Sequence, residues 1–273
     1  MTQTIPYWHV DAFSATPFGG NQAAVMVLDA WLDDPTLQAV GEENNFAETA
    51  FLVRDESDAA DWELRWFTPT DEVALCGHAT LASGHVILSD TARFGAGERV
   101  RFATRKSGVL EVVRKDDGYE LALPLTRVKP SSQPELLAAI GFRGETFLSY
   151  EGAGQTAIIL MESEAEIRAL QPDMTKLGAI DLMAICTAPG EKHDIVSRVF
   201  VPAWGVPEDS VTGAAHAALA PFWAERLGRT ELTAHQASTR GGDLTLRLAT
   251  DNGAERAWLG GPCVTVVEGT FYL

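Results

Sequence analysis

The chain has 273 residues, of which 46% are hydrophobic, enough to form a large core and more naturally two domains than one. Its 21 lysines and arginines against 38 aspartates and glutamates give a net charge of −17, which excludes nucleic acid and anionic membranes as partners over most of the surface. Three scattered cysteines, Cys76, Cys186 and Cys263, form neither a disulfide framework nor a zinc motif, so we expect a reducing compartment. No segment resembles a leader peptide or approaches the length of a transmembrane helix, and we therefore expect a cytoplasmic protein.

The first half of the chain is predicted to mix strands and helices. Asp33 or Asp34 is expected to cap a helix that has Pro35 in its first turn and ends near Glu43. A central helix follows Gly77. Apolar runs between turn residues predict strands at residues 7–13, 23–28, 49–53, 62–67, 100–104, 109–113 and 119–123.

The second half begins after a predicted linker at residues 124–134, with a helix expected from Pro134 to Ile140. Pro221 falls inside the helix that follows Gly213. It has no amide to donate to the Ala217 carbonyl, so we expect it to kink or end that helix. Residues 260–273 predict one or two strands after a glycine turn.

An internal repeat relates the two halves. Asn21–Val27 aligns with Gly154–Leu160, and Phe67 aligns with Phe200 at the same offset along the chain. The turn residues Gly77 and Gly213 are slightly further apart than this offset, which is restored in the segments that follow the two central helices. A shared order of individually weak matches predicts two related α/β lobes, and binding sites favour the interface between such lobes.

The two glycine turns are candidate anion sites. Gly77 lets the backbone bend closely, and the helix that follows it begins with amide groups that have no partner inside the helix. Aligned peptide dipoles place roughly half a positive charge there, so a substrate carboxylate could be held without a lysine or arginine. The alternative interpretation is a glycine turn before an ordinary core helix. We expect function where the two turns face each other.

Six segments together resemble the phenazine-biosynthesis PhzF-like family over nearly the whole chain. They are Asp11–Phe13, Gly20–Asn21, Asn45–Phe51, Leu75–Leu81, Glu208–Gly213 and Gln236–Gly242. The resemblance implies an α/β (α+β) fold of the diaminopimelate epimerase-like type, in which two pseudo-symmetric lobes each wrap a curved mixed or antiparallel sheet around a central helix. Residues 1–125 would form the first lobe and 126–262 the second, with 263–273 returning to the first.

The resemblance also implies isomerase chemistry without a cofactor or metal, on a small anionic carboxylate, and commonly a homodimer. Glu48 matches the family's acid/base glutamate, which would take a proton from one carbon and return it to another. His78 and Asp209 match residues that flank the substrate. The matching substrate-binding positions are Gly77, His78, Gly213, Ala214 and Asn21. Which acid is the substrate stays open.

Three residues depart from the family pattern: Gln22, Ser210 and Ala214. The last two motivate an alternative, a binding protein that kept the cleft and lost the chemistry. A two-base racemase is a second alternative, but the repeat partner of Cys76 is Thr212, whose hydroxyl is too weak an acid.

Two further types of site would involve histidine. A Cys/His hydrolase using Cys76 and His78 stays open on spacing alone. The remaining histidines show no ligand-like cluster in the sequence, which argues against a metal enzyme; they are His9, His85, His193, His216 and His235.

Overall fold

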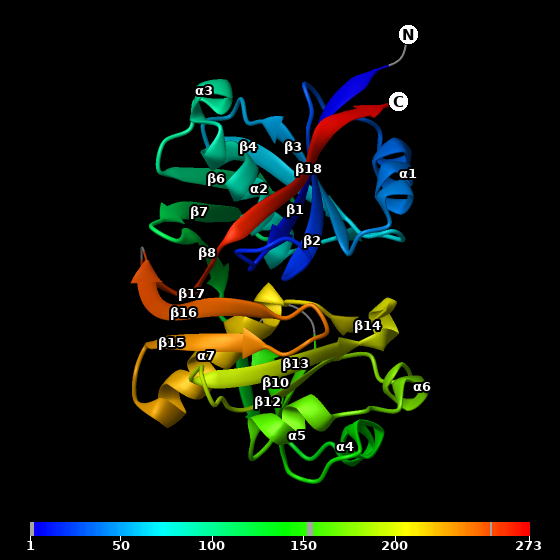
Figure 1. Ribbon diagram of the computed structural model, residues 1–273, viewed down its shortest axis with the longest axis vertical. Coiled ribbons are helices and arrows are strands. Elements are labelled where there is room, and N and C mark those ends of the chain that lie inside the picture. The colour runs from blue at the N-terminus through cyan, green and yellow to red at the C-terminus, as the bar shows by residue number, and fades with distance from the viewer. Residues whose placement is uncertain (1–2, 152–154, 252) are drawn as a thin grey trace. The chain divides into compact units, whose positions relative to one another are not determined.

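The computed structural model describes residues 3–151, 155–251 and 253–273 (Figure 1). Gly154, which enters the repeat alignment, and the first two residues lie outside these ranges. The chain divides into two compact units, Met1–Ala122 together with Gly260–Leu273, and Leu123–Leu259. Within the described ranges, no helix is both long and apolar enough to cross a membrane.

The first unit is built on a mixed sheet. Its strands are β1 (Thr4–Ala12), β2 (Asn21–Val27), β3 (Glu48–Arg54), β4 (Trp62–Phe67), β5 (Glu72–Val73), β6 (Arg99–Thr104), β7 (Val109–Lys115), β8 (Gly118–Pro124) and β18 (Cys263–Tyr272). The order β18–β1–β2–β3–β4–β6–β7–β8 is antiparallel except for the parallel pairs β2–β3 and β4–β6. The last strand of the chain therefore lies beside the first (Figure 1).

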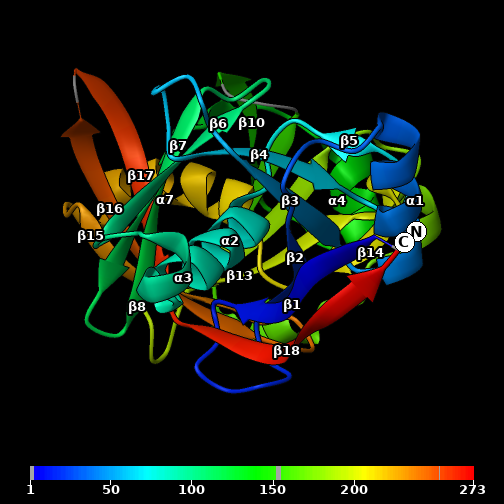
Figure 2. The same ribbon diagram turned by 90° about the horizontal axis from the view of Figure 1, so that it is seen from above.

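Helix α2 (Gly77–Ser89) is the centre of the first unit, which also contains α1 (Asp34–Asn44) and α3 (Thr91–Phe94). Every residue of α2 except His85 and Ser89 is buried, because small and apolar side chains cover its whole circumference. The helix packs against β18 and β1 at one end of the strand order and against β6 and β7 near the other. The sheet therefore curves around α2 (Figure 2).

The second unit repeats this arrangement. Its strands are β9 (Arg127–Pro130), β10 (Glu145–Glu151), β11 (Thr156–Leu160), β12 (Met183–Pro189), β13 (Ile195–Val201), β14 (Val206–Asp209), β15 (Glu231–Gln236), β16 (Gly242–Asp251) and β17 (Ala254–Gly261). Along β9–β10–β11–β12–β13–β15–β16 the pairs are antiparallel except β11–β12 and β13–β15, which is the succession seen in the first unit. The segment predicted as a linker thus contributes β9, in the place that β18 takes in the first unit.

Helix α7 (Gly213–Leu227) is the counterpart of α2 and packs against β9, β15 and β16. The shorter helices of this unit are α4 (Pro134–Ile140), α5 (Glu164–Ala169), α6 (Met174–Leu177) and the 3₁₀ turn η1 (Pro202–Trp204). Of the two expected effects of Pro221, a kink or an end of the helix, the end is wrong, since α7 continues to Leu227. The Ala217 carbonyl that Pro221 cannot serve accepts a hydrogen bond from the Thr126 amide at 3.3 Å, so the helix loses little by containing the proline.

A duplicated arginine contact shows the repeat at the level of atoms. Arg65 donates two hydrogen bonds of 2.8 Å to the carboxylate of Glu72. Arg198, at the equivalent position of the repeat, donates to Glu208 at 2.7 and 2.9 Å. Each guanidinium also lies 5.0 Å from the ring centroid of a phenylalanine that follows it on the same strand. Each pair ties the central strand, β4 or β13, to the segment that leads into the central helix.

Candidate functional site

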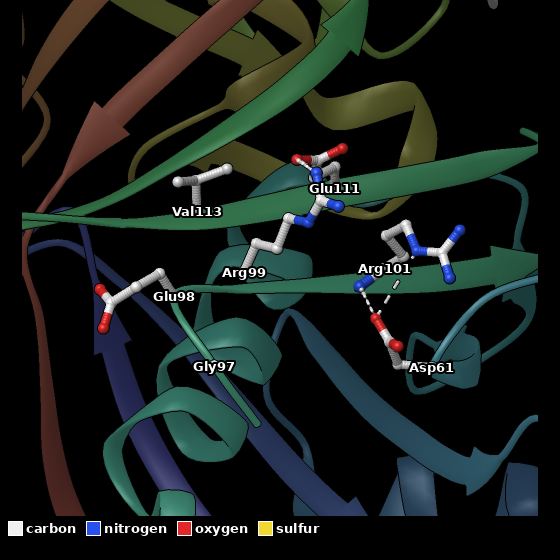
Figure 3. A pocket seen from close by; sticks show the side chains of 7 residues that line it. All are labelled: Asp61, Gly97, Glu98, Arg99, Arg101, Glu111 and Val113. Atoms are coloured by element: carbon white, nitrogen blue, oxygen red, sulfur yellow. Dashed lines mark hydrogen bonds and ion pairs between the residues drawn. The ribbon is translucent and has the colours of Figure 1, made fainter. Parts of the chain in front are cut away.

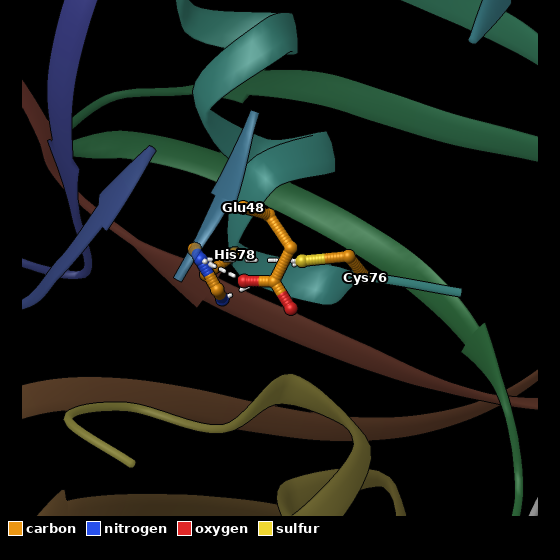
Figure 4. A group of neighbouring side chains, drawn as sticks. All are labelled: Glu48, Cys76 and His78. Atoms are coloured by element: carbon orange, nitrogen blue, oxygen red, sulfur yellow. Dashed lines mark hydrogen bonds and ion pairs between the residues drawn. The ribbon is translucent and has the colours of Figure 1, made fainter. Parts of the chain in front are cut away.

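Three chemically active side chains meet where β3 and α2 begin (Figure 4). Glu48 is the first residue of β3, and His78 is the second residue of α2, directly after the cap residue Cys76 and Gly77. Oε2 of Glu48 lies 3.0 Å from Nε2 of His78, with the His78 side chain 5% exposed and that of Glu48 18% exposed. The predicted acid/base residue and the predicted flanking histidine are therefore neighbours in the first unit.

One oxygen of the Glu48 carboxylate is free to accept a hydrogen bond. Oε2 of Glu48 is buried and has no hydrogen-bond partner within the described part of the chain. Its 3.0 Å contact with Nε2 of His78 is an ion pair. A buried acceptor without a hydrogen-bond partner is costly to the fold and is available to a proton or a substrate.

The other nitrogen of His78, Nδ1, lies 3.1 Å from Nδ2 of Asn21 and 3.6 Å from Sγ of Cys76. Burial by itself lowers the pKa of His78, but the acidic groups Cys76 and Glu48 beside the ring raise that pKa well above its ordinary value. Burial raises the pKa of the Cys76 thiol to about 11, so this thiol is protonated near neutral pH. The Glu48 carboxylate is therefore the charge that stabilises the imidazolium of His78.

The protonated state of Cys76 argues against two functions left open by the sequence, a Cys/His hydrolase and a two-base racemase. Only the thiolate is a strong nucleophile or base, and a buried thiol with a pKa of about 11 forms little of it. The contact with His78 does not reverse this, because burial is the largest influence on the thiol. The geometry therefore favours Cys76 as a small packing residue over a hydrolase nucleophile or a racemase base.

The second unit assembles its own group at the start of α7. Oδ2 of Asp209 accepts a hydrogen bond of 2.6 Å from the Thr212 hydroxyl. The Thr212 amide donates to Oε1 of Gln236 at 2.8 Å, and Nε2 of Gln236 donates to the Asp209 carbonyl at 2.8 Å. Gln236 is fully buried and fixes both residues. We did not predict this role, although Gln236 opens one of the six segments that resemble the family.

Gly77 and Gly213 open the two central helices, as expected from the repeat. The side chains of Cys76 and Thr212 make no capping hydrogen bond to a backbone amide of the helix that follows. Thr212 instead directs its hydroxyl to Asp209. Each helix start thus presents backbone amides that its own cap side chain does not cover, in keeping with anion binding. That Gly213 and Ala214 share one cleft with Glu48 and His78 stays a prediction.

A surface pocket of the first unit lies on other elements and contains none of the predicted site residues (Figure 3). Its walls are Asp61, Gly97, Glu98, Arg99, Arg101, Glu111 and Val113. The charges there pair with one another: Arg99 lies 3.8 Å from Glu111, and Arg101 lies 3.8 Å from Asp61. We therefore assign no catalytic role to this pocket.

Two groups of side chains within the described ranges have donor atoms close enough to hold a metal ion. The donors of Glu48, Cys76 and His78 lie within 4.8 Å of one another, but the protonated thiol is a poor ligand. The second group joins His193 and His235 to Asp243. The expectation that the histidines form no ligand-like cluster is therefore wrong for these two, which the fold brings together.

Comparison with known proteins agrees with this architecture. The family described as "Phenazine biosynthesis-like protein" matches residues 10–269. The chain is 45% identical over 271 residues to the uncharacterized isomerase PA3578 of Pseudomonas aeruginosa, covering 98% of this chain and 99% of that protein. A crystal structure of a phenazine biosynthesis protein of the PhzF family from Enterococcus faecalis is 37% identical and superposes with a TM-score of 0.85, covering 99% of this chain and 100% of that one. A predicted epimerase, PA4716 of Pseudomonas aeruginosa, shares the fold at 20% identity, with a TM-score of 0.70 and coverage of 98% and 99%.

Proposed function

Because this chain belongs to the family of phenazine biosynthesis-like proteins, we propose that it is a cofactor-independent isomerase acting on a small carboxylic acid. The isomerase class is supported by the names of its relatives, of which one is 45% identical. The acid/base mechanism is supported above all by Glu48, whose Oε2 is buried without a hydrogen bond among the described residues and lies 3.0 Å from His78.

In the proposed reaction the Glu48 carboxylate takes a proton from one carbon of the substrate, and the resulting carboxylic acid returns it to another. The electron pair of the broken C–H bond moves into the substrate's π system, and the new C–H bond forms at the far end. His78 lies 3.0 Å from the Glu48 carboxylate on one side of its ring, and Asn21 lies 3.1 Å from Nδ1 on the other side. Such positioned acid/base groups contribute roughly 10²- to 10⁴-fold to a rate.

The substrate carboxylate would be bound by helix-start amides. The backbone amides of Gly77 and His78 at the start of α2 and those of Gly213 and Ala214 at the start of α7 are the proposed donors. This would let a chain of net charge −17 bind an anion without a basic side chain. Asp209, fixed by Thr212 and Gln236, is proposed to orient the substrate.

Exchange of substrate hydrogen with solvent deuterium tests the role of Glu48. The parent and Glu48→Gln are incubated in deuterated water with cyclic and amino-acid carboxylates, and incorporation is followed by NMR. We expect the variant to exchange at least a hundredfold more slowly. Glu111→Gln is the matched control, since Glu111 lies on β7 of the same unit, outside the candidate site, and pairs with Arg99.

Equal exchange by the parent and Glu48→Gln would exclude Glu48 as the proton carrier. Ligands that bind without any exchange in the parent would favour the binding protein, the alternative suggested by Ser210 and Ala214. Exchange that depends on Cys76 rather than on Glu48 would favour the racemase.

A further inference from the structure

We propose that His193, His235 and Asp243 form a binding site for a divalent transition-metal ion such as Zn²⁺ on the second unit. One donor atom from each residue lies within 4.8 Å of the others. Oδ1 of Asp243 is 2.6 Å from Nδ1 of His235 and 3.4 Å from Nε2 of His193. The two imidazole rings are stacked, with centroids 5.4 Å apart and planes inclined by 19°.

Backbone structure brings the three residues together. His235 on β15 and Asp243 on β16 are direct cross-strand partners, so their side chains share one face of the sheet. His193 lies in the turn between β12 and β13. Its neighbour Asp194 ties this turn to β15, because Oδ2 of Asp194 accepts from the Thr233 amide at 2.7 Å and the Asp194 amide donates to the Thr233 hydroxyl at 3.0 Å.

The turn itself is tight. The amide of Gly190 donates to the Asp194 carbonyl at 3.2 Å, and a Cβ on Gly190 would lie 2.5 Å from the His193 carbonyl oxygen. Only glycine permits this close approach, so the turn presents His193 in a restricted position. Donors held before binding lose less freedom when the ion arrives.

The donor set matches the chemistry of borderline metals. Imidazole suits zinc, copper and nickel, and a carboxylate completes a three-ligand set that leaves a fourth position for water. With bonds of about 2.0–2.1 Å, the ligand atoms of a tetrahedral zinc site are roughly 3.3 Å apart. The distance from His193 to Asp243 is already close to this value. The shorter contact of His235 with Asp243 is at hydrogen-bond distance, and the ion would displace the proton between the two atoms. The side chain of Asp243 is 65% exposed and can move by the required amount.

One acidic residue lies near the site. Glu164, at the start of α5, is close enough for His235 to influence it, while its carboxylate oxygens accept from Arg168 and from the Glu191 amide. The site differs in its residues and elements from the group of Glu48, Cys76 and His78. It therefore stands or falls independently of the proposed isomerase activity.

Calorimetric titration of the whole chain with ZnCl₂ tests the proposal. We expect one ion per chain with a dissociation constant that rises at least tenfold in His235→Gln and in Asp243→Asn. Asp117→Asn removes an exposed carboxylate in the β7–β8 turn and serves as the charge control, with binding unchanged. Cys76→Ser separates the two candidate groups, and it too should leave this binding unchanged.

Histidine ring signals in NMR spectra of the parent provide a readout that needs no variant. Zn²⁺ should shift the signals of His193 and His235 and leave those of His78 in place. The proposal is overturned if the parent binds no zinc, or if binding is lost in Cys76→Ser while His235→Gln retains it. It is also overturned if zinc moves the His78 signals and spares the other two, even where a variant fails to fold.

Discussion

The protonation of one histidine decides what Glu48 can do. A buried imidazole ordinarily stays neutral, and His78 is 4% exposed. Its pKa is nevertheless raised well above the ordinary value, because acidic groups lie against the ring and the Glu48 oxygen is 3.0 Å away. By contrast His216, buried in the second unit without a carboxylate partner in the described structure, has its pKa lowered to about 4. Both histidines are buried, so the difference between their pKa values comes from the charged groups beside them.

We predict that Glu48→Gln lowers the pKa of His78, since burial then acts without the opposing carboxylate. The ring titration followed by NMR measures this, with Glu111→Gln as the control that leaves the midpoint unchanged. In the parent, the pKa of His78 is higher in the folded protein than in the unfolded chain. The charged His78 ring therefore contributes stability that is fully present below the ordinary imidazole pKa. This stability is lost as the pH rises through the raised pKa of the folded protein. An unchanged midpoint in Glu48→Gln would show that another group holds the charge.

At the scale of elements, the two central helices are buried because most of their residues are small or apolar. In α2, Gly84 faces β7 so closely that a Cβ there would lie 2.4 Å from Cγ1 of Val112. The strand can approach the helix backbone only at a residue without a side chain. In α7, the proline is tolerated because Thr126, in the connection between β8 and β9, donates its amide hydrogen to the Ala217 carbonyl. Packing partners thus override local helix preferences in both units.

Gly84→Ala should therefore destabilise the protein despite the better helix propensity of alanine. Overpacking against Val112 costs about 1–3 kcal/mol, and the gain in propensity returns roughly 1 kcal/mol at most. Urea unfolding should show a net loss of up to about 2 kcal/mol. Gly97→Ala is the comparison, because a Cβ at Gly97 would meet nothing within 4 Å and should change stability little. A stabilised Gly84→Ala would mean that β7 can move away.

At the scale of the whole molecule, the half-buried His85 of the first unit and the buried His216 of the second both have a lowered pKa. Burial, assisted by Arg114, lowers the pKa of His85 to about 4 in the first unit, and burial lowers that of His216 to about 4 in the second. Nδ1 of His216 contacts the Thr212 carbonyl at 2.8 Å, while Nε2 has no hydrogen-bond partner in the described structure. Both rings therefore favour unfolding when the solvent supplies protons.

We expect stability to fall as the pH drops from about 6.5 toward 4. In this range His85 and His216 bind protons in the unfolded chain but stay neutral in the folded protein. For His216 the loss reaches about 2 kcal/mol at pH 5, a pH at which most carboxylates are still ionised. Urea unfolding at pH 7, 6 and 5 measures it, and His216→Gln should lose that much less than the parent. Parallel curves for the two proteins would contradict the assignment.

Sequence patterns predicted the parts of this protein that depend on neighbours along the chain or on its duplication. The turns at Gly77 and Gly213, the helix cap at Asp33 and the family segments that carry Glu48 and His78 were all available there. The family and its epimerase-like fold are confirmed by the comparisons. Roles of the individual site residues stay predictions until exchange is measured.

Only the tertiary structure decided which distant residues meet. His193 and His235 are far apart in the sequence, and a turn, a parallel strand pair and a cross-strand partner bring them to Asp243. The donor for Ala217 comes from Thr126, far back in the chain, and Gln236 reaches Asp209 across the second unit's sheet. Such contacts depend on strand register and on how elements pack, and local propensity carries no information about either.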